Sequence, residues 1–231
     1  MTNENEQSRL SRNDIHSDEI KRHLERINHE FDEGFEFLKR YPKSVTIFGS
    51  SQARPEEEHY KKAEELAGRI VRELNYAVAT GGGPGIMEAG NKGAFEAGGI
   101  SLGFNISLPH ERVTNAYATH SMKFAYFFSR KTMLVFAAEA CVFFPGGFGT
   151  LDELFNILTL IQGDKVPKVP VILYDSNYWS HLRNFLKDHA LNEYHALSEE
   201  HLNLFEITDS LDRIIEIIKK APVSEWWRNI N

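Results

Sequence analysis

The sequence predicts a doubly wound α/β domain, in which helices flank a parallel sheet, with a long helix ahead of it. Short β-rich runs alternate with helical patterns through most of the chain, which is typical of βαβ units. Three of these runs end in glycine-bearing turns that open helices. Ahead of the first run, apolar residues recur at close to helical spacing from about Asn13 to Arg40. We therefore expect a disordered tail over residues 1–12, an amphipathic helix up to residue 40, and a single domain over 41–231.

The predicted elements follow in order after Pro42, which ends the first helix. Strands are expected at 45–48, 76–80, 100–105, 140–144, 169–174 and, at an edge of the sheet, 205–207. Helices are expected at 55–74, 85–97, from the loop after the fourth strand to about 162, 177–189 and 209–220. A loop over 107–117 and an aromatic segment over 122–138 separate the third and fourth strands.

Composition and charge exclude several classes of function. The formal net charge of −7 argues against a nucleic-acid coat or a protein that binds anionic membranes. The longest apolar stretch, 133–144, contains Glu139 and is too short to span a bilayer, and the N-terminus lacks a signal-peptide pattern. The single cysteine, Cys141, cannot form a disulfide within the chain, and a small buried side chain is favoured over a nucleophile. We expect a cytoplasmic protein.

The three glycine turns are the strongest indication of a ligand site. They are Gly49-Ser50-Ser51, the run from Gly81 to Gly85, and the run from Gly146 to Thr150. Ligands of open parallel sheets sit beyond the carboxyl ends of the strands, where helix N-termini offer free N–H groups to an anion. Tight βα turns alone would also require glycine, but three such turns at one edge favour a phosphate site. Neither dense loop matches G-x-G-x-x-G, and no Gly-Lys-Ser/Thr occurs, so a mononucleotide or sugar phosphate is favoured over NAD or ATP.

Glu153 allows two interpretations. Thr150-x-x-Glu153 matches a capping box, in which the two side chains would satisfy free N–H groups at the start of a helix. A carboxylate close to a bound phosphate is electrostatically unfavourable, however, and glycosidic-bond cleavage would explain it. In that reaction a carboxylate stabilises an oxocarbenium-like transition state or activates water.

The run Pro145–Glu153 (PGGFGTLDE) resembles the P-G-G-x-G-T-x-x-E signature of the LOG (Lonely Guy) phosphoribohydrolases, whose members are often labelled lysine decarboxylases. The pair Arg130-Lys131, the turn FGSS (48–51) and the loop TGGGPGIMEAGNKGA (80–94) also resemble that family, so the resemblance covers about residues 44–174. It implies a Rossmann-like, usually dimeric hydrolase that releases a free base and ribose 5-phosphate from nucleoside 5′-monophosphates. The long N-terminal helix and residues 84–88 differ from plant members, which activate cytokinins, and resemble the bacterial branch.

The resemblance also implies roles for individual residues. Arg130 and Glu153 would be the catalytic pair. Without the resemblance, Arg130 would be interpreted as a surface arginine. The 5′-phosphate would be bound by Gly146, Gly147, Gly149 and Thr150. The rest of the substrate would be bound by Ser50, Gly82, Gly83 and Glu88, although Glu88 is equally well explained as a favourable charge in the first turn of a helix.

Several alternatives stay open at this point. The aromatic residues between 124 and 128 are expected in the core, at an interface or against the base. A pyridoxal-phosphate decarboxylase is disfavoured because nothing in the sequence marks a Schiff-base lysine, and no histidine pattern indicates a metal site. We expect no cofactor, a nucleoside 5′-monophosphate as substrate (AMP or cytokinin riboside monophosphate), and a homodimer or higher homo-oligomer. The competing interpretation is a non-catalytic carrier or sensor of a nucleotide or of molybdenum cofactor.

Overall fold

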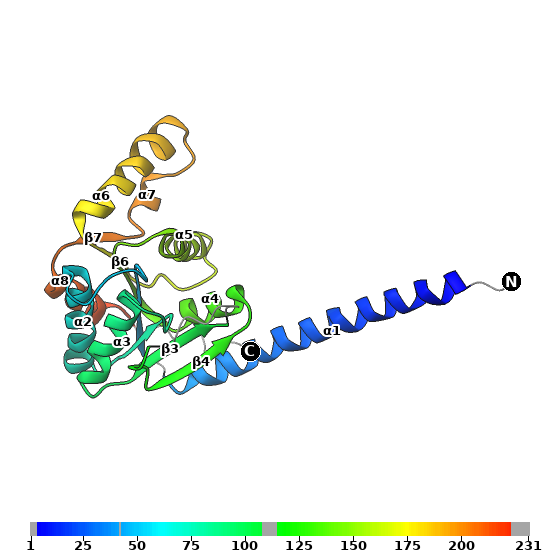
Figure 1. The fold of residues 1–231 in the computed structure, drawn as a ribbon. Helices are drawn as coiled ribbons and strands as arrows, with labels where there is room; N and C mark the ends of the chain where they lie inside the picture. The colour runs from blue at the N-terminus through cyan, green and yellow to red at the C-terminus, as the bar shows by residue number, and fades with distance from the viewer. Residues whose placement is uncertain (1–3, 42, 108–114, 223–231) are drawn as a thin grey trace.

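The computed structural model describes residues 4–41, 43–107 and 115–222 of the chain. Its centre is a seven-stranded sheet in the order β4-β3-β2-β1-β5-β6-β7, and every described pair of neighbouring strands is parallel (Figure 1). The strands are β1 (Ser44–Phe48), β2 (Ala77–Thr80), β3 (Ser101–Ile106), β4 (His120–Phe124), β5 (Ala138–Phe143), β6 (Val171–Tyr174) and β7 (Glu206–Thr208). The predicted doubly wound, Rossmann-like α/β fold is confirmed.

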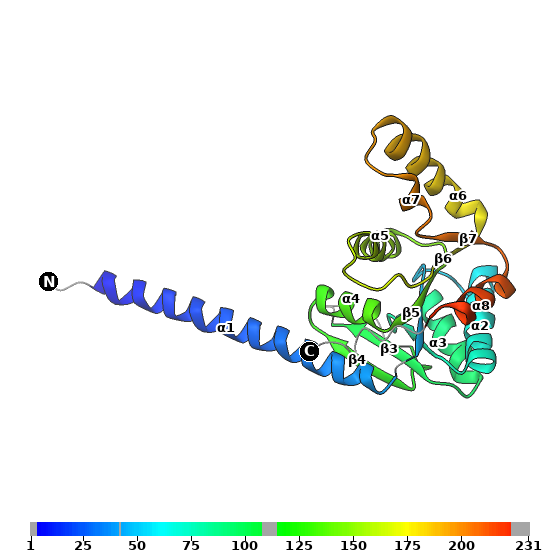
Figure 2. The ribbon, with the colours of Figure 1, turned by 180° about the vertical axis from the view of Figure 1, so that it is seen from behind.

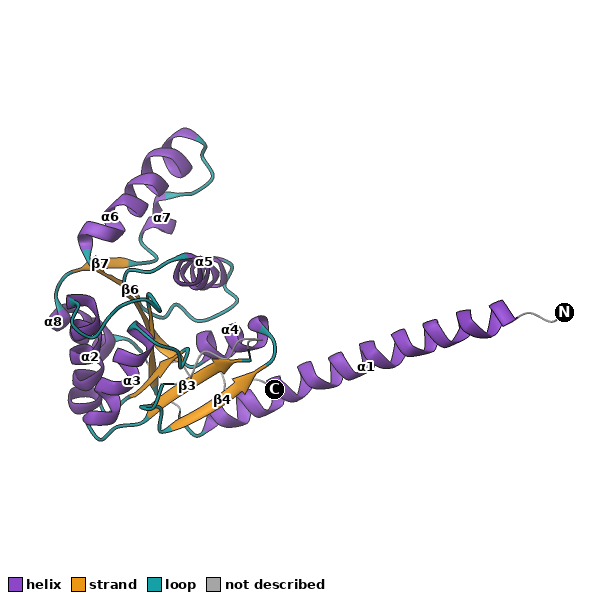
Figure 3. Cartoon of the chain, viewed as in Figure 1, coloured by secondary structure: helices purple, strands orange, loops and turns teal. Residues whose placement is uncertain are grey.

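Helices cover both faces of this sheet (Figures 2 and 3). One face carries α2 (Glu58–Arg69), the π-helical segment η1 (Ile70–Leu74), α3 (Ile86–Glu96) and α8 (Leu211–Lys220). The other face carries part of α1 (Glu4–Lys39), α4 (Phe127–Phe136), α5 (Phe148–Gln162) and α6 (Ser176–Phe185). Between β6 and β7, α6 continues into η2 (Leu186–Glu193) and the short α7 (Glu199–Leu202). None of the described helices is both long enough and apolar enough to cross a bilayer.

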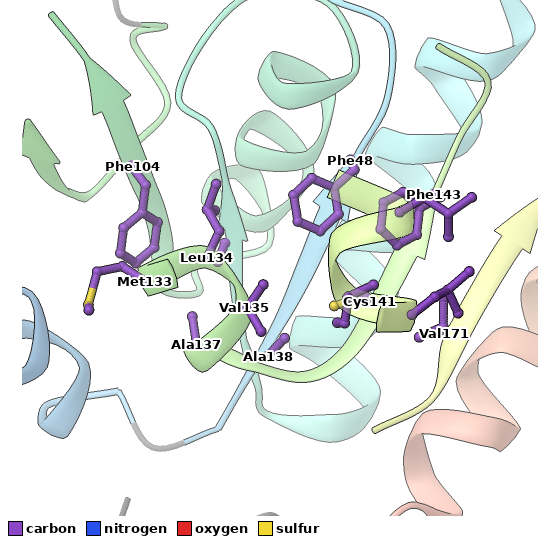
Figure 4. Close-up of a cluster of buried hydrophobic side chains, with 14 of the residues drawn as sticks. Phe48, Phe104, Met133, Leu134, Val135, Ala137, Ala138, Cys141, Phe143 and Val171 are labelled. Atoms are coloured by element: carbon purple, nitrogen blue, oxygen red, sulfur yellow. The ribbon is translucent and has the colours of Figure 1, made fainter. Parts of the chain in front are cut away.

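Alternating side chains along the central strands supply both cores. In β5, Ala140 and Val142 face the layer of α2, α3 and α8, whereas Cys141 and Phe143 face α4 and α5. Figure 4 shows the second cluster, in which the rings of Phe48 and Phe143 stack with their centroids 4.6 Å apart. Cys141 is fully buried there, and burial raises the pKa of its thiol. The prediction that Cys141 is a buried apolar residue is therefore confirmed.

The N-terminal helix is longer than expected. It begins at Glu4, within the segment for which a disordered tail was expected. This segment contains neither proline nor glycine and is rich in Glu, Gln, Arg and Leu, which favour helix. The C-terminal part of α1 packs against α4, whereas its N-terminal part extends away from the domain (Figures 1 and 2). Glu30 anchors the packed part, because its buried carboxylate accepts hydrogen bonds from the Ala125 N–H (2.6 Å) and the Ser129 hydroxyl.

Strand β4 was not predicted, since its region was assigned only as an aromatic segment. Its sequence, HSMKF, has only two apolar residues, Met122 and Phe124, and three of its five residues are exposed at the edge of the sheet. Pairing with β3 rather than intrinsic preference makes it a strand. Of the loop predicted at 107–117, residues 108–114 lie outside the described part of the chain.

The strand order places a switch point between β1 and β5. From β1 the chain winds outward through β2 to β4, and from β5 it winds in the opposite direction through β6 to β7. Open α/β sheets bind ligands in the crevice beyond the carboxyl ends of the strands at such a point. The turns that follow β1 and β5 are two of the three glycine turns.

Candidate active site

The three glycine turns meet around one cavity of about 860 Å³ at the carboxyl edge of the sheet. The turns after β1 and β5 are joined directly, because the Ser50 N–H donates to the carbonyl of Pro145 (3.0 Å). The turn after β2 is joined to them by the Ile86 N–H, which donates to the carbonyl of Ser50 (3.0 Å). The predicted site residues that line the cavity are Ser50, Gly82, Gly83, Arg130, Gly147, Gly149, Thr150 and Glu153.

The loop after β5 presents the start of α5 to this cavity. The helix begins at Phe148 with Gly147 as its N-cap, and no side chain caps it. Its first amides therefore lack intrahelical partners and lie at the positive end of the helix dipole. A Cβ built on Gly147 or Gly149 would meet no atom within 4 Å, so the missing side chains leave the backbone open to the cavity. The arrangement suits an anion such as phosphate.

Gly146 is needed for a different reason. A Cβ at this position would lie 2.1 Å from Oγ1 of Thr150 and 3.0 Å from the backbone nitrogen of Ser50. Gly146 is thus packed behind the loop and is not among the residues that line the cavity. Its predicted contact with phosphate becomes an indirect one, through the conformation of the loop.

The predicted capping box is wrong. Thr150 lies in the first turn of α5 rather than at its N-cap, because the helix starts three residues earlier than the pattern indicates. The carboxylate of Glu153 is therefore not used for capping, and its buried Oε2 has no hydrogen-bond partner among the described residues. Burial raises the pKa of Glu153 to about 6, against the opposing effects of the Lys131 and Arg130 cations. A carboxyl with that pKa is mostly ionised at neutral pH and can still accept a proton.

Arg130 is a cavity residue rather than a surface arginine. Its Nε donates to the carbonyl of Phe104 (2.6 Å) and its Nη2 to the carbonyl of Gly81 (3.2 Å), at the ends of β3 and β2. A Cβ on Gly81 would lie 2.1 Å from Nη2, so only glycine leaves room for the guanidinium. Burial lowers the pKa of Arg130, and the negative charge of Glu153 partly offsets this. Within the described residues the two side chains form no ion pair at 4.0 Å or less, so opposite charges face a shared cavity without direct contact.

Glu88 lies elsewhere. It accepts a hydrogen bond from the hydroxyl of Tyr60 (2.9 Å), which ties α3 to α2, and it does not line the cavity. Tyr60 is buried, and both burial and Glu88 raise the pKa of its phenol. Glu88 thus lies in the first turn of α3, as its structural interpretation requires, and outside the described lining of the cavity.

The residues of the aromatic run lie in three different environments within the chain. Phe124 is fully buried in the core. Tyr126 meets α1, where its hydroxyl lies 2.6 Å from Nδ1 of His23, and Phe128 packs against Phe31. Phe127 is exposed and lines the cavity.

Sequence reasoning did not assign several residues of the cavity wall. Asn105 and Lys123 line it at the ends of β3 and β4, and Phe148 stands at its mouth with 93% of its surface exposed. Lys123 could not be found because β4 was not predicted. Phe148 could have been assigned to the cavity from the sequence, because it is an apolar residue between the glycines of a loop expected to bind a ligand. Among the described residues, no group of three or more His, Cys, Asp or Glu side chains is placed to hold a metal ion.

Comparison with known proteins identifies the family. A family model described as "Possible lysine decarboxylase" matches residues 87–218, which is more than half of the chain. The chain belongs to this family. The similar curated proteins include LOG-type enzymes, whose signature the run Pro145–Glu153 resembles.

Two of these relatives carry the same activity in their names. The cytokinin riboside 5′-monophosphate phosphoribohydrolase of Rhodococcoides fascians is 27% identical over 157 residues, which cover 65% of this chain and 77% of that protein. The corresponding enzyme LOG5 of Arabidopsis thaliana is 27% identical over 159 residues, which cover 68% and 69%. The resemblance to LOG enzymes is thereby confirmed, and a LOG-type hydrolase is supported at modest identity.

Solved structures share the fold at lower identity. The molybdenum cofactor carrier protein of Chlamydomonas reinhardtii has a TM-score of 0.57 and 20% identity, and the comparison covers 78% of this chain and 98% of that one. The molybdenum cofactor binding protein of Rippkaea orientalis has a TM-score of 0.56 and 20% identity, with 77% and 95% covered. At this identity the similarity concerns the fold alone.

Proposed function

We propose that this protein hydrolyses the N-glycosidic bond of nucleoside 5′-monophosphates, of the AMP or cytokinin riboside monophosphate type. The products would be a free base and ribose 5-phosphate. The observation that carries the proposal is the buried Oε2 of Glu153, which has no hydrogen-bond partner among the described residues, in a side chain that shares one cavity with the uncapped start of α5. A carboxylate left without a partner beside an anion site costs stability, and a charge-stabilising role in the reaction explains it.

The proposed mechanism begins with the 5′-phosphate on the first amides of α5 and the Thr150 hydroxyl. As the bond between C1′ and the base nitrogen breaks, positive charge develops on the ribose, and the Glu153 carboxylate stabilises it. Water then attacks C1′. Glu153 accepts the proton that this water releases and returns it to solvent, while the departing base nitrogen takes up one proton from solvent, so the reaction consumes one water and no net proton. Ser50, Gly82 and Gly83 would contact the rest of the nucleotide from the opposite wall.

Arg130 would keep the carboxylate charged and oriented. Its guanidinium is fixed by two backbone carbonyls, so it offers a positive charge that does not need to reorganise during the reaction. This positive charge lowers the pKa of Glu153 and would offset the negative charge that the phosphate brings into the cavity.

The family description suggests a lysine decarboxylase, which requires pyridoxal phosphate and a lysine for its Schiff base. Lys123 lies on the edge strand β4 and is exposed, whereas such a lysine is activated by desolvation or by a neighbouring cation. The described cavity residues do not fit that cofactor, and we derive no step from it.

The test is a direct assay of base release. Purified protein would be incubated with AMP, GMP, CMP, UMP and isopentenyladenosine monophosphate, and free base and ribose 5-phosphate would be quantified by chromatography. Glu153→Gln should lose at least about a hundredfold in rate, because it keeps the shape but not the charge. Glu96→Gln, an exposed carboxylate at the far end of α3, is the matched control and should keep the wild-type rate.

A carrier of molybdenum cofactor is the second candidate, because two proteins of the same fold are named as a molybdenum cofactor binding protein and a molybdenum cofactor carrier protein. A carrier would bind a phosphate-bearing ligand without turnover, and its affinity would not require the Glu153 carboxylate. Binding of nucleotide without base release by wild-type protein would therefore support it. We also propose that the protein acts in the cytoplasm as a homodimer or higher oligomer, which sedimentation of the purified protein would test.

A further inference from the structure

The conformation of the loop after β5 depends on contacts made behind the cavity. The carbonyl of Pro145 accepts from the Ser50 N–H (3.0 Å), and the carbonyl of Gly146 accepts from the hydroxyl of Tyr178 (2.5 Å). Tyr178 comes from α6, 32 residues further along the chain, and it does not line the cavity. Both carbonyls are thus held by groups other than a ligand.

Holding a carbonyl also fixes the N–H of the same peptide group. The peptide between Gly146 and Gly147 is planar and trans, so its N–H points opposite to its C=O. Tyr178 binds the carbonyl from outside the cavity, whereas Gly147 lines it. The Gly147 N–H is therefore aimed toward the cavity beside the first amides of α5.

The start of α6 is built to hold Tyr178 in this position. The Asp175 side chain caps the helix by accepting from the N–H groups of Asn177 (2.9 Å) and Tyr178 (3.3 Å). Asp175 has a φ of +91°, an unusual conformation for a residue with a side chain, and Nε2 of His59 on α2 lies 2.8 Å from its Oδ2. The next residue along, Trp179, is fully buried and anchors the turn in the core.

We propose that Tyr178 is a positioning residue for phosphate: its hydroxyl holds the Gly146 carbonyl away from the cavity, so that the Gly147 N–H joins the first amides of α5 in binding the anion. The proposal rests on the phosphate role given to this loop in the proposed function. Without the hydroxyl, the peptide can rotate and present its carbonyl oxygen to the anion. The loss of one oriented hydrogen bond should weaken phosphate binding about threefold to tenfold.

The test compares Tyr178→Phe with Tyr194→Phe. The first change removes only the hydroxyl, and the second removes the hydroxyl of a largely exposed tyrosine just after η2. Calorimetry would measure the dissociation constants of inorganic phosphate and ribose 5-phosphate for each protein. We expect the Tyr178→Phe protein to bind both about threefold to tenfold more weakly, and the Tyr194→Phe protein to match wild type.

A spectroscopic measurement separates positioning from a general loss of stability. The chain contains 16 glycines, so selective ¹⁵N-glycine labelling gives a small set of amide signals, and Gly147→Ala identifies the signal of Gly147. In the Tyr178→Phe protein, the Gly147 signal should shift and should respond less to phosphate, while glycines outside the loop keep their positions. An unchanged Gly147 signal, or an equal change at glycines throughout the domain, would overturn the proposal.

The outcomes also distinguish this proposal from the proposed function. Wild-type protein that binds ribose 5-phosphate but releases no base would end the hydrolase proposal, and the comparison of variants would still decide the role of Tyr178. Wild-type protein that binds neither phosphate nor ribose 5-phosphate would overturn the role of Tyr178 itself.

Discussion

Replacing Glu153 by Gln should stabilise the protein at neutral pH while it removes activity. Burial raises the pKa of Glu153 from 4.5 to about 6, a difference of about 1.5. Each pKa unit is worth about 1.36 kcal/mol, so ionising this carboxylate costs the folded state about 2 kcal/mol. Because the folded state holds the proton more tightly than the unfolded chain, the cost is absent below pH 4.5. It grows between pH 4.5 and 6 and is complete above pH 6.

The assay is thermal and urea unfolding of wild type and Glu153→Gln between pH 4 and pH 8. At pH 7.5 the variant should be more stable by about 2 kcal/mol, which for a chain of this length raises Tm by about 4–8 °C. At pH 4 the difference should disappear, because the wild-type carboxyl is then protonated and neutral like the amide. A variant that is equally or less stable at pH 7.5 would refute this reasoning, because the carboxylate would then be held by favourable contacts rather than left unpaired.

Three further predictions follow from the same geometry. In Arg130→Lys, the lysine cannot keep both hydrogen bonds that the guanidinium donates to backbone carbonyls. In steady-state assays, kcat/KM for the nucleotide should therefore fall about a hundredfold. Retention of the full rate would contradict the proposed role of Arg130. Gly146→Ala places a methyl group 2.1 Å from Oγ1 of Thr150, and urea unfolding should show a loss of about 1–3 kcal/mol together with weaker phosphate binding. Glu30→Ala leaves the buried Ser129 hydroxyl and a backbone N–H of the domain without their acceptor. The free energy of unfolding should fall by about 2–3 kcal/mol, and proteolysis within α1 should increase. Unchanged protease resistance would count against the role of Glu30 as an anchor.

Much of the fold was predictable because the sheet is buried on both faces. Successive side chains of the central strands enter the cores on the two faces of the sheet, so most residues of these strands are apolar. The strands can therefore be recognised in the sequence as short apolar runs between helical patterns. Strand β4 lies at the edge, with one neighbour and an exposed surface, and its HSMKF sequence holds no such signal. Its pairing with β3 is a tertiary contact that cannot be predicted from the local sequence pattern.

The parts of the candidate site in which backbone geometry requires a particular residue could be predicted from the sequence. The roles that depend on contacts between distant side chains could be predicted less well. Gly81 and Gly146 are fixed by close approaches that leave no room for a Cβ, and such positions show in the sequence as glycine-rich turns. The contact of Glu88 could not be predicted, because its partner, Tyr60, lies 28 residues away on another helix. The capping-box pattern of Thr150 and Glu153 failed because the helix begins three residues earlier, with the open Gly147 as its N-cap.

The single helix α5 carries both the proposed anion site and the Glu153 carboxylate, and its geometry fixes the distance between them. Gly149 and Glu153 are four residues apart, which is about 6 Å along the axis at a rise of about 1.5 Å per residue. A ribose with its 5′-carbon spans a similar length, so a phosphate on the first turn would bring C1′ close to the carboxylate one turn further on. The bound phosphate would also raise the pKa of Glu153 further, because a second negative charge disfavours ionisation. The cations of Lys131 and Arg130 on the facing helix α4 oppose that effect. The proposed hydrolysis at neutral pH would therefore depend on these two cations of α4 as well as on the glycine loop, because they favour the ionised form of Glu153 that is needed to stabilise the developing charge.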